Sequence, residues 1–233
     1  MNYRDIREAA LRANMMLPEL GLVLFTFGNV SAADQAQGVF AIKPSGVPYP
    51  ALTPEDMVIV DFEGRIVEGR LRPSSDTLTH AVLYQHWPQL GGICHTHSSY
   101  GTAWAQALRD IPIMGTTHAD HLTEDIPCAP PMDDYRIQGN YERETGYQIL
   151  DCFRTRGLDP AAAPMVLVGS HAPFAWGATA EKAVYHAAVL EELAKMAYLS
   201  LQIDPQAPRL KPALIRKHYE RKHGAQAYYG QDT

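Results

Sequence analysis

The chain is short of the features that mark several large classes of protein. Its three cysteines, Cys94, Cys128 and Cys152, form no CxxC pair and no disulfide framework, which favours a reducing cytoplasm. No apolar run reaches the roughly 18 residues of a membrane span, so we expect no membrane association. We also expect no signal peptide, because the first residues lack its apolar centre. The phosphate-binding fingerprint GxGxxG and the motif GxxxxGK are both missing, which argues against NAD or a nucleotide.

An excess of basic residues is missing as well. Lysine and arginine total 20 against 26 acidic residues, for a formal net charge of −6. Nucleic-acid binding generally needs a basic footprint, so we expect no nucleic-acid partner. The hydrophobic fraction of 46% suits a globular protein with a substantial core. A length of 233 residues, without repeats or low-complexity segments, predicts a single domain over residues 1–233.

Hydrophobic periodicity and turn residues predict alternating helices and strands. Helices are expected at 3–17, 76–86, 98–107, 133–156 with a break near Gly139, 179–201 and 213–223. Strands are expected at 22–27, 39–42, 57–60, 65–67, 93–97 and 165–168. Tight turns between strands imply antiparallel pairing, and the long helices imply cover on both faces. The predicted fold is therefore α/β, with three layers and a central, largely antiparallel sheet.

His95 and His97 are the most informative residues. They are two apart in an expected strand, so their side chains point to the same side. Neutral imidazole is the commonest metal ligand, and His171, just after the strand at 165–168, is the best third candidate. Asp76, at the start of a helix, is a candidate fourth ligand or an orienting group. Three nitrogens and one oxygen suit Zn²⁺, and Mn²⁺ or Co²⁺ would also fit.

Three turns rich in small residues adjoin the expected elements. They are Gly28-Asn29-Val30-Ser31-Ala32, Lys43-Pro44-Ser45-Gly46 and Pro73-Ser74-Ser75-Asp76. These turns offer backbone N–H groups, hydroxyls and a helix N-terminus, and Lys43 adds a positive charge. A phosphate site is built from such groups. Each turn alone is no more than a turn, because glycine and serine favour turns anyway. A lysine beside three such turns indicates a phosphate.

Seven stretches resemble the class II aldolase/epimerase family. They are GNVSA (28–32), IKPSG (42–46), PSSDT (73–77), GGICHTHS (91–98), GTTHAD (115–120), SHAPFAWG (170–177) and KHYERKHGAQAYYGQ (217–231). The HTH and KPSG motifs occur across this family, which also includes fuculose-phosphate aldolase and the adducin head domain. GTTHAD and KHGAQAYYGQ resemble more specifically the branch that epimerises ribulose 5-phosphate. The similarity runs nearly from end to end.

The resemblance implies a largely antiparallel sheet between helical layers, in a cyclic homotetramer with active sites at subunit interfaces. The metal, usually zinc, would be held at Asp76, His95, His97 and His171. Substrate and phosphate would be held at Gly28, Asn29, Lys43, Ser45, Gly46, Ser74, Ser75 and His218. Asp120 matches an acid/base aspartate, and Tyr229 matches an acid/base group from the neighbouring subunit, with His218 nearby. Ala172 stands where the family has glycine, which would be unfavourable if that position required a positive φ.

The resemblance also implies a reaction, the interconversion of L-ribulose 5-phosphate and D-xylulose 5-phosphate. The ketone at C2 acidifies the protons on C1 and C3 but not the proton on C4, so simple deprotonation cannot invert C4. Oxidation by a nicotinamide would need a dinucleotide fingerprint, which the sequence lacks. Cleavage and re-formation of the C3–C4 bond remain. A Lewis-acid metal would stabilise the negative charge, with Asp120 and Tyr229 exchanging protons on opposite sides.

Three alternatives stay open. The first is a class II aldolase that releases dihydroxyacetone phosphate or products of the glycolaldehyde phosphate type; such aldolases typically carry glutamate at the position of Asp76. The second is a metal-free interaction module like the adducin head, which predicts loss of the ligand set, whereas all four positions are intact. The third is a zinc hydrolase, which would leave the KPSG and SSD turns unexplained.

Overall fold

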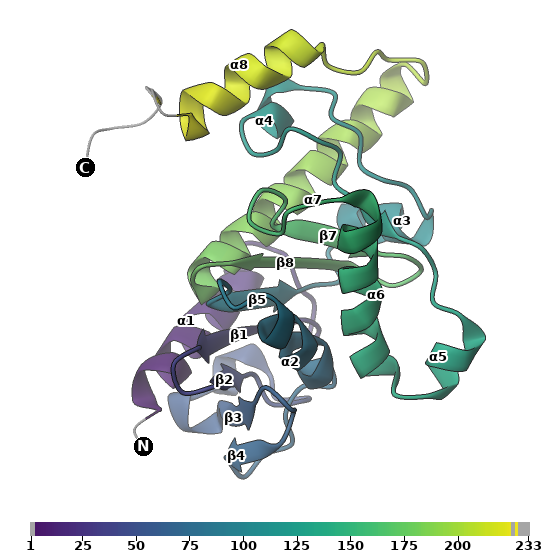
Figure 1. The fold of residues 1–233 in the computed structure, drawn as a ribbon. Coiled ribbons are helices and arrows are strands. Elements are labelled where there is room, and N and C mark those ends of the chain that lie inside the picture. Colours follow the sequence, from purple (N-terminus) through teal and green to yellow (C-terminus); the bar gives the residue numbers. More distant parts are fainter. Residues whose placement is uncertain (1–2, 225–226, 228–233) are drawn as a thin grey trace.

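The centre of the fold is one sheet with the strand order β4-β3-β2-β1-β5-β8-β7-β6 (Figure 1). The computed structural model describes residues 3–224 and 227. The strands are β1 (Asn29–Asp34), β2 (Val39–Ile42), β3 (Val58–Asp61), β4 (Ile66–Glu68), β5 (Gly92–His95), β6 (Cys128–Ala129), β7 (Met165–Val168) and β8 (Pro173–Gly177). Neighbouring strands pair antiparallel, except β6 and β7, which are parallel.

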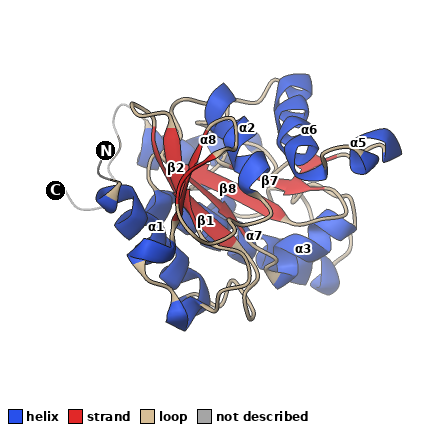
Figure 2. Ribbon diagram, turned by 90° about the horizontal axis from the view of Figure 1, so that it is seen from below, coloured by secondary structure: helices blue, strands red, loops and turns tan. Residues whose placement is uncertain are grey.

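Helices cover both faces of this sheet. The α-helices are α1 (Arg4–Glu19), α2 (Thr77–His86), α3 (Ser99–Gln106), α4 (Thr116–Ala119), α5 (Asp134–Gln138), α6 (Tyr141–Arg156), α7 (Ala180–Ile203) and α8 (Pro212–His223). Short 3₁₀ turns occupy Tyr49–Ala51 and Pro54–Asp56. Figure 2 shows α1, α3 and α7 on one face of the sheet and α2 and α6 on the other. The predicted three-layer fold with a largely antiparallel sheet is therefore confirmed.

Local sequence explains where the long helices begin and end. The Thr179 hydroxyl accepts a hydrogen bond from the Lys182 N–H, which caps α7 where the predicted helix begins. The Asn140 side chain caps α6 in the same way, after the expected break at Gly139. Gly157 ends α6 in the left-handed conformation, with φ of 64°.

The strand predicted at 22–27 is wrong, and β1 begins only at Asn29. Gly21 and Gly28 have φ of 67° and 74°, so the chain turns at both ends of the segment. The Tyr49 hydroxyl donates to the Phe27 carbonyl, which takes the place of a strand neighbour. Phe25 is 83% exposed with φ of 53°. The apolar character of this segment therefore belongs to a surface loop rather than to the sheet.

Three smaller expectations also need correction. Pro18 lies inside α1 rather than ending it. The strand predicted at 93–97 ends at His95, so His97 follows it in a loop. Three strands, β1, β6 and β8, were not predicted. β8 gives a weak strand signal because it begins with proline, ends with glycine and contains an alanine, all of which are depleted in strands.

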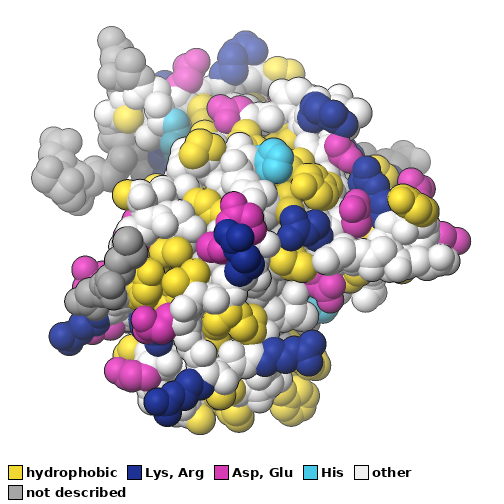
Figure 3. Space-filling view, turned by 60° about the horizontal axis from the view of Figure 1, so that its bottom comes forward, with side chains coloured by type: hydrophobic (Ala, Val, Ile, Leu, Met, Phe, Trp, Pro, Cys, Tyr) yellow, Lys and Arg dark blue, Asp and Glu magenta, His cyan; other side chains and the backbone are white. Residues whose placement is uncertain are grey.

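The described surface mixes charges of both signs. On the face in Figure 3, lysine and arginine side chains are interspersed with aspartate and glutamate. Among the described residues, no helix combines the length and the apolar character needed to cross a bilayer.

Candidate active site

One cavity collects nearly all the residues that the sequence singled out. It has a volume of about 450 Å³, within the range of small-molecule sites. It is lined by Thr26, Phe27, Gly28, Asn29, Lys43, Pro44, Ser45, Gly46, Ser74, Ser75, Asp76, His95, His97, Tyr141, Glu142 and His171. Every predicted metal position and every predicted phosphate position, His218 apart, is among them.

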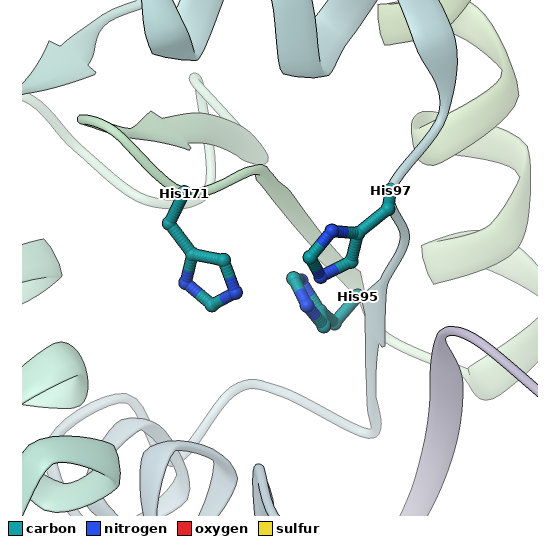
Figure 4. A group of neighbouring side chains, drawn as sticks. All are labelled: His95, His97 and His171. Atoms are coloured by element: carbon teal, nitrogen blue, oxygen red, sulfur yellow. The ribbon is translucent and has the colours of Figure 1, made fainter.

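The three histidines form a compact group (Figure 4). Their ligand atoms all lie within 4.8 Å of one another, and their ring centroids are 4.9 to 5.1 Å apart. His95 comes from the end of β5, His97 from the loop after it, and His171 from the turn between β7 and β8. Although His97 lies outside the strand, its ring still faces those of its partners.

Burial keeps the histidine rings neutral. It lowers the pKa of His95 to about 3 and that of His171 to about 4, and it also lowers the pKa of His97. His95 Nδ1 lies 2.9 Å from the Pro173 carbonyl oxygen, which can only accept, so Nδ1 carries the proton. His95 Nε2 therefore presents a lone pair to the other two rings. Neutral imidazoles with free lone pairs are what a divalent cation requires, so the donor set fits a metal.

Asp76 borders the histidine group. Its Oδ2 lies 4.0 Å from His95 Nε2 and accepts a hydrogen bond of 2.6 Å from Asn29 Nδ2. Asp76 occupies the N-cap position of α2, yet within the described residues its side chain makes no capping hydrogen bond to that helix. The carboxylate is therefore directed to the cavity rather than used for helix capping.

The three small-residue turns meet in space. The Ser45 N–H donates to the Arg72 carbonyl and the Ser74 N–H donates to the Lys43 carbonyl, which joins the second turn to the third. Gly28, in the first turn, has φ of 74°, and a Cβ there would come within 2.9 Å of the His95 carbonyl oxygen. Only glycine permits the first turn to approach β5 so closely.

Lys43 is the cation of this cavity. Its side chain is 2% exposed, and burial lowers its pKa to about 8. Within the described part of the chain, Nζ reaches two backbone carbonyls, of Thr26 and Pro44, each at 3.4 Å. It also lies 4.9 Å from the centre of the Tyr49 ring. A buried ammonium group held by such long contacts is suited to bind an anion.

Asp120 and His218 lie together but outside the cavity lining. Asp120 Oδ1 is 2.9 Å from His218 Nδ1, and Arg221 donates to both carboxylate oxygens of Asp120. Burial raises the pKa of Asp120, but the hydrogen bonds from Arg221 and His218 outweigh it and leave that pKa lowered. Figure 1 shows their elements, α4 and α8, at one end of the molecule, away from α2. Tyr229 lies outside the described residues.

Sequence reasoning missed several residues of the cavity wall, among them Phe27, Tyr141 and Glu142. The Tyr141 hydroxyl lies 3.5 Å from His171 Nδ1. Tyr141 and Glu142 open α6 just after Gly139 and Asn140, and that predicted helix break was the one available signal. Ala172 is buried, and the positive φ of this turn, 61°, falls on Ser170 and not on Ala172. The substitution of alanine there is accommodated.

The fold and the site together define the class. The chain belongs to the family described as the class II aldolase and adducin N-terminal domain, whose pattern matches residues 8–198. The curated L-ribulose-5-phosphate 4-epimerases UlaF of Salmonella paratyphi B and Salmonella typhi are each 49% identical to it over 228 residues, covering 98% of this chain and 99% of each relative. The resemblance drawn from the motifs is thus confirmed.

Solved structures support the same fold. An L-fuculose 1-phosphate aldolase superposes with a TM-score of 0.78 at 22% identity, covering 95% of this chain and 97% of its own. The corresponding enzyme of Glaciozyma antarctica gives a TM-score of 0.73 at 18% identity, covering 96% and 86%. At such identities the likeness concerns the fold.

Proposed function

We propose that this protein interconverts L-ribulose 5-phosphate and D-xylulose 5-phosphate in a metal-dependent reaction. The observation that carries the proposal is the convergence of the histidine group, Asp76 and the three turns on one cavity. The identity of 49% to curated epimerases over almost the whole chain supports the choice of reaction. The intact ligand positions and the anion-binding turns argue against an interaction module and against a zinc hydrolase.

His95, His97 and His171 would hold the ion, with Asp76 as a fourth ligand or as the group that orients it. Zinc fits this donor set, and manganese or cobalt would also fit. When bound, the ion supplies Lewis-acid stabilisation of the negative charge that develops on the substrate oxygens.

Lys43 and the three turns would bind the substrate. Lys43 Nζ supplies the positive charge, and Gly46 and Gly28 expose backbone at positive φ. Ser45, Ser74 and Ser75 add hydroxyl and N–H donors, and Asn29 offers its amide. These groups keep the phosphate end fixed while the rest of the substrate reacts.

The reaction would proceed through C3–C4 cleavage. Loss of the C4 hydroxyl proton turns the C4–O bond into a carbonyl, and the C3–C4 electron pair moves into the enediolate of dihydroxyacetone. The glycolaldehyde phosphate formed rotates about its bound phosphate, and the enediolate re-adds to the opposite face. Inversion therefore needs a proton acceptor on one side and a donor on the other, the roles we assign to Asp120 and Tyr229.

A second copy of the chain would supply these two groups. Asp120 is held against His218 and Arg221, outside the cavity that holds the histidine group. A cyclic homotetramer brings such a surface of one subunit against the cavity of the next. The lowered pKa of Asp120 keeps it ionised at neutral pH, the form that a proton acceptor needs.

Product analysis separates this activity from that of an aldolase. The purified protein is incubated with L-ribulose 5-phosphate and, separately, with L-fuculose 1-phosphate. We expect D-xylulose 5-phosphate from the first and no cleavage of the second. Release of a free aldehyde as the main product would favour the aldolase. Negligible carbon-13 isotope effects at both C3 and C4, where chemistry limits the rate, would refute the cleavage route.

A further inference from the structure

Between β1 and α2 lies a chain of buried hydrogen bonds that the proposed function does not use. Ser31 Oγ is 2.7 Å from His80 Nδ1 and 2.7 Å from Tyr84 Oη. The side chains of Ser31 and His80 are 0% exposed, and that of Tyr84 is 1% exposed. The His80 ring also meets the edge of Phe174, on which the His95 ring stacks. His80 is therefore a neighbour of the histidine group without belonging to it.

Two polar atoms beside these buried hydrogen bonds have no hydrogen-bond partner among the described residues. They are His80 Nε2 and Asn29 Oδ1, and Asn29 is only 2% exposed. Buried polar groups in folded proteins are nearly always paired, with protein or with ordered water. Two unpaired atoms at the same β1–α2 contact point to one shared partner.

The geometry of the two elements sets the spacing between two hydrogen-bonded connections that join them. Asn29 and Ser31 lie on one face of β1, about 6.6 Å apart, because a strand rises about 3.3 Å per residue. Asp76 and His80 lie one turn apart along α2, about 6 Å, at 1.5 Å per residue. Asn29 bonds Asp76 and Ser31 bonds His80, so the strand and the helix are joined by two parallel connections.

We propose that one buried water lies between these connections and joins His80 Nε2 to Asn29 Oδ1, which makes His80 a positioning residue of the metal centre. A water makes hydrogen bonds of about 2.8 Å, so it can join two atoms that lie up to about 5.6 Å apart. The Asp76 carboxylate, already bonded to Asn29, adds acceptor capacity beside the water, which needs two to four polar partners. Because water both donates and accepts, it pairs with either tautomer of His80.

The water would act through the Asn29 amide. With Oδ1 held by the water, the amide cannot flip, so Nδ2 stays directed at Asp76 Oδ2. Ser31 bonds the His80 ring and is itself bonded to Tyr84, which fixes the orientation of the ring. The fixed ring would position the water, and through Asn29 the water would position the Asp76 carboxylate. Groups that orient metal ligands in this way typically change metal affinity about 10- to 100-fold when removed. The inference rests on the proposed metal centre.

Crystallography of the zinc-loaded native protein tests the water directly. We expect one ordered water within about 3.2 Å of both His80 Nε2 and Asn29 Oδ1. A direct bond from His80 Nε2 to a protein atom, or no ordered water at that position, would overturn the proposal.

Metal binding tests the role of His80. His80→Phe keeps an aromatic ring beside Phe174 but removes the nitrogens. We expect Co²⁺ affinity to fall about 10- to 100-fold and the visible Co²⁺ spectrum to shift. The matched control is His86→Phe, on the same helix, where Nδ1 bonds the Val82 carbonyl and the residue does not line the cavity. Ser31→Ala, which frees the His80 ring, should shift affinity and spectrum in the same direction and serves if the His80 variant does not fold.

The outcomes are distinguishable. Native affinity and an unchanged Co²⁺ spectrum in His80→Phe or Ser31→Ala would overturn the positioning role while leaving the metal centre intact. A native protein that binds no Co²⁺ would overturn the metal centre and this inference together.

Discussion

Replacing Lys43 with methionine should make the protein more stable and bind its substrate more weakly. The buried ammonium group has a pKa of about 8 instead of its ordinary 10.5 because burial disfavours its charged form. That difference corresponds to about 3 kcal/mol of unfolding free energy at neutral pH. Methionine has a similar shape and no charge to bury, so Lys43→Met should recover part of this energy.

The pH dependence has a defined sign. The pKa of Lys43 is lower in the folded state, so its destabilising effect is fully present below about pH 8. The effect is lost as the pH rises from about 8 to 10.5, where the unfolded chain also releases its proton. The stability advantage of Lys43→Met should therefore be largest at neutral pH and vanish near pH 10.5.

Substrate binding should change in the opposite direction. A charge-assisted hydrogen bond contributes about 1.5–3 kcal/mol, so losing it should raise KM roughly 10- to 150-fold. In the native protein, KM should rise with pH above about 8 as Lys43 loses its proton, with kcat less affected. Lys43→Arg, which stays charged, should lack this alkaline rise.

Two measurements are sufficient. Urea unfolding of native and variant protein at pH 7 and pH 10 gives the stability difference, and steady-state kinetics from pH 6.5 to 9.5 gives KM. A Lys43→Met protein with native stability at pH 7 and native KM would refute the assignment of Lys43 as a buried phosphate-binding cation.

Further predictions concern the subunit interface, the first turn and the metal. The variants His97→Asn and Asp120→Asn should each be inactive alone. If each site combines two chains, co-refolding the two variants in equal amounts should recover about a quarter of native activity. No recovery would place both groups in one chain. Gly28→Ala should lower the unfolding free energy by about 1–3 kcal/mol or more, through positive φ and the clash with the His95 carbonyl, in a urea titration. Gly38→Ala, with similar φ but no atom within 4 Å of the added Cβ, is its control, and equal losses would rule out the clash. Burial lowers the pKa of His171 to about 4, so its ring stays neutral well below pH 7. Metal affinity, measured by competition, should therefore stay nearly constant from pH 8 to about 6. A steep loss of affinity near pH 6.5 would indicate solvated rings.

Much of the fold was predictable because its strong signals are local. The turns at 35–38 and around Gly64, the cap at Thr179 and the break at Gly139 each depend on residues a few positions apart. The segment 22–27 was misassigned because its apolar pattern is that of a strand. Its actual path is set by glycine conformations and by the contact of Tyr49 with Phe27, which lies 22 residues away in sequence.

The candidate site was predictable as a set of residues but not as an arrangement. The spacing of His95 and His97 indicated a metal, and the turns indicated a phosphate. Their meeting in one cavity depends on long-range contacts, such as the Lys43 carbonyl with the Ser74 N–H. Tyr141 and Glu142 reach the cavity only because α6 packs against α2, a contact that no local pattern carries. The assignment of Asp120 depends on a second chain and remains a prediction.

The most direct test of the central claim is an NMR time course with L-ribulose 5-phosphate, comparing verified metal-free protein with the same protein after zinc is restored. We predict no conversion without metal, and conversion to an equilibrium mixture with D-xylulose 5-phosphate, without free glycolaldehyde phosphate, once zinc is present. Undiminished conversion by the metal-free protein, or accumulation of the free aldehyde, would contradict the account.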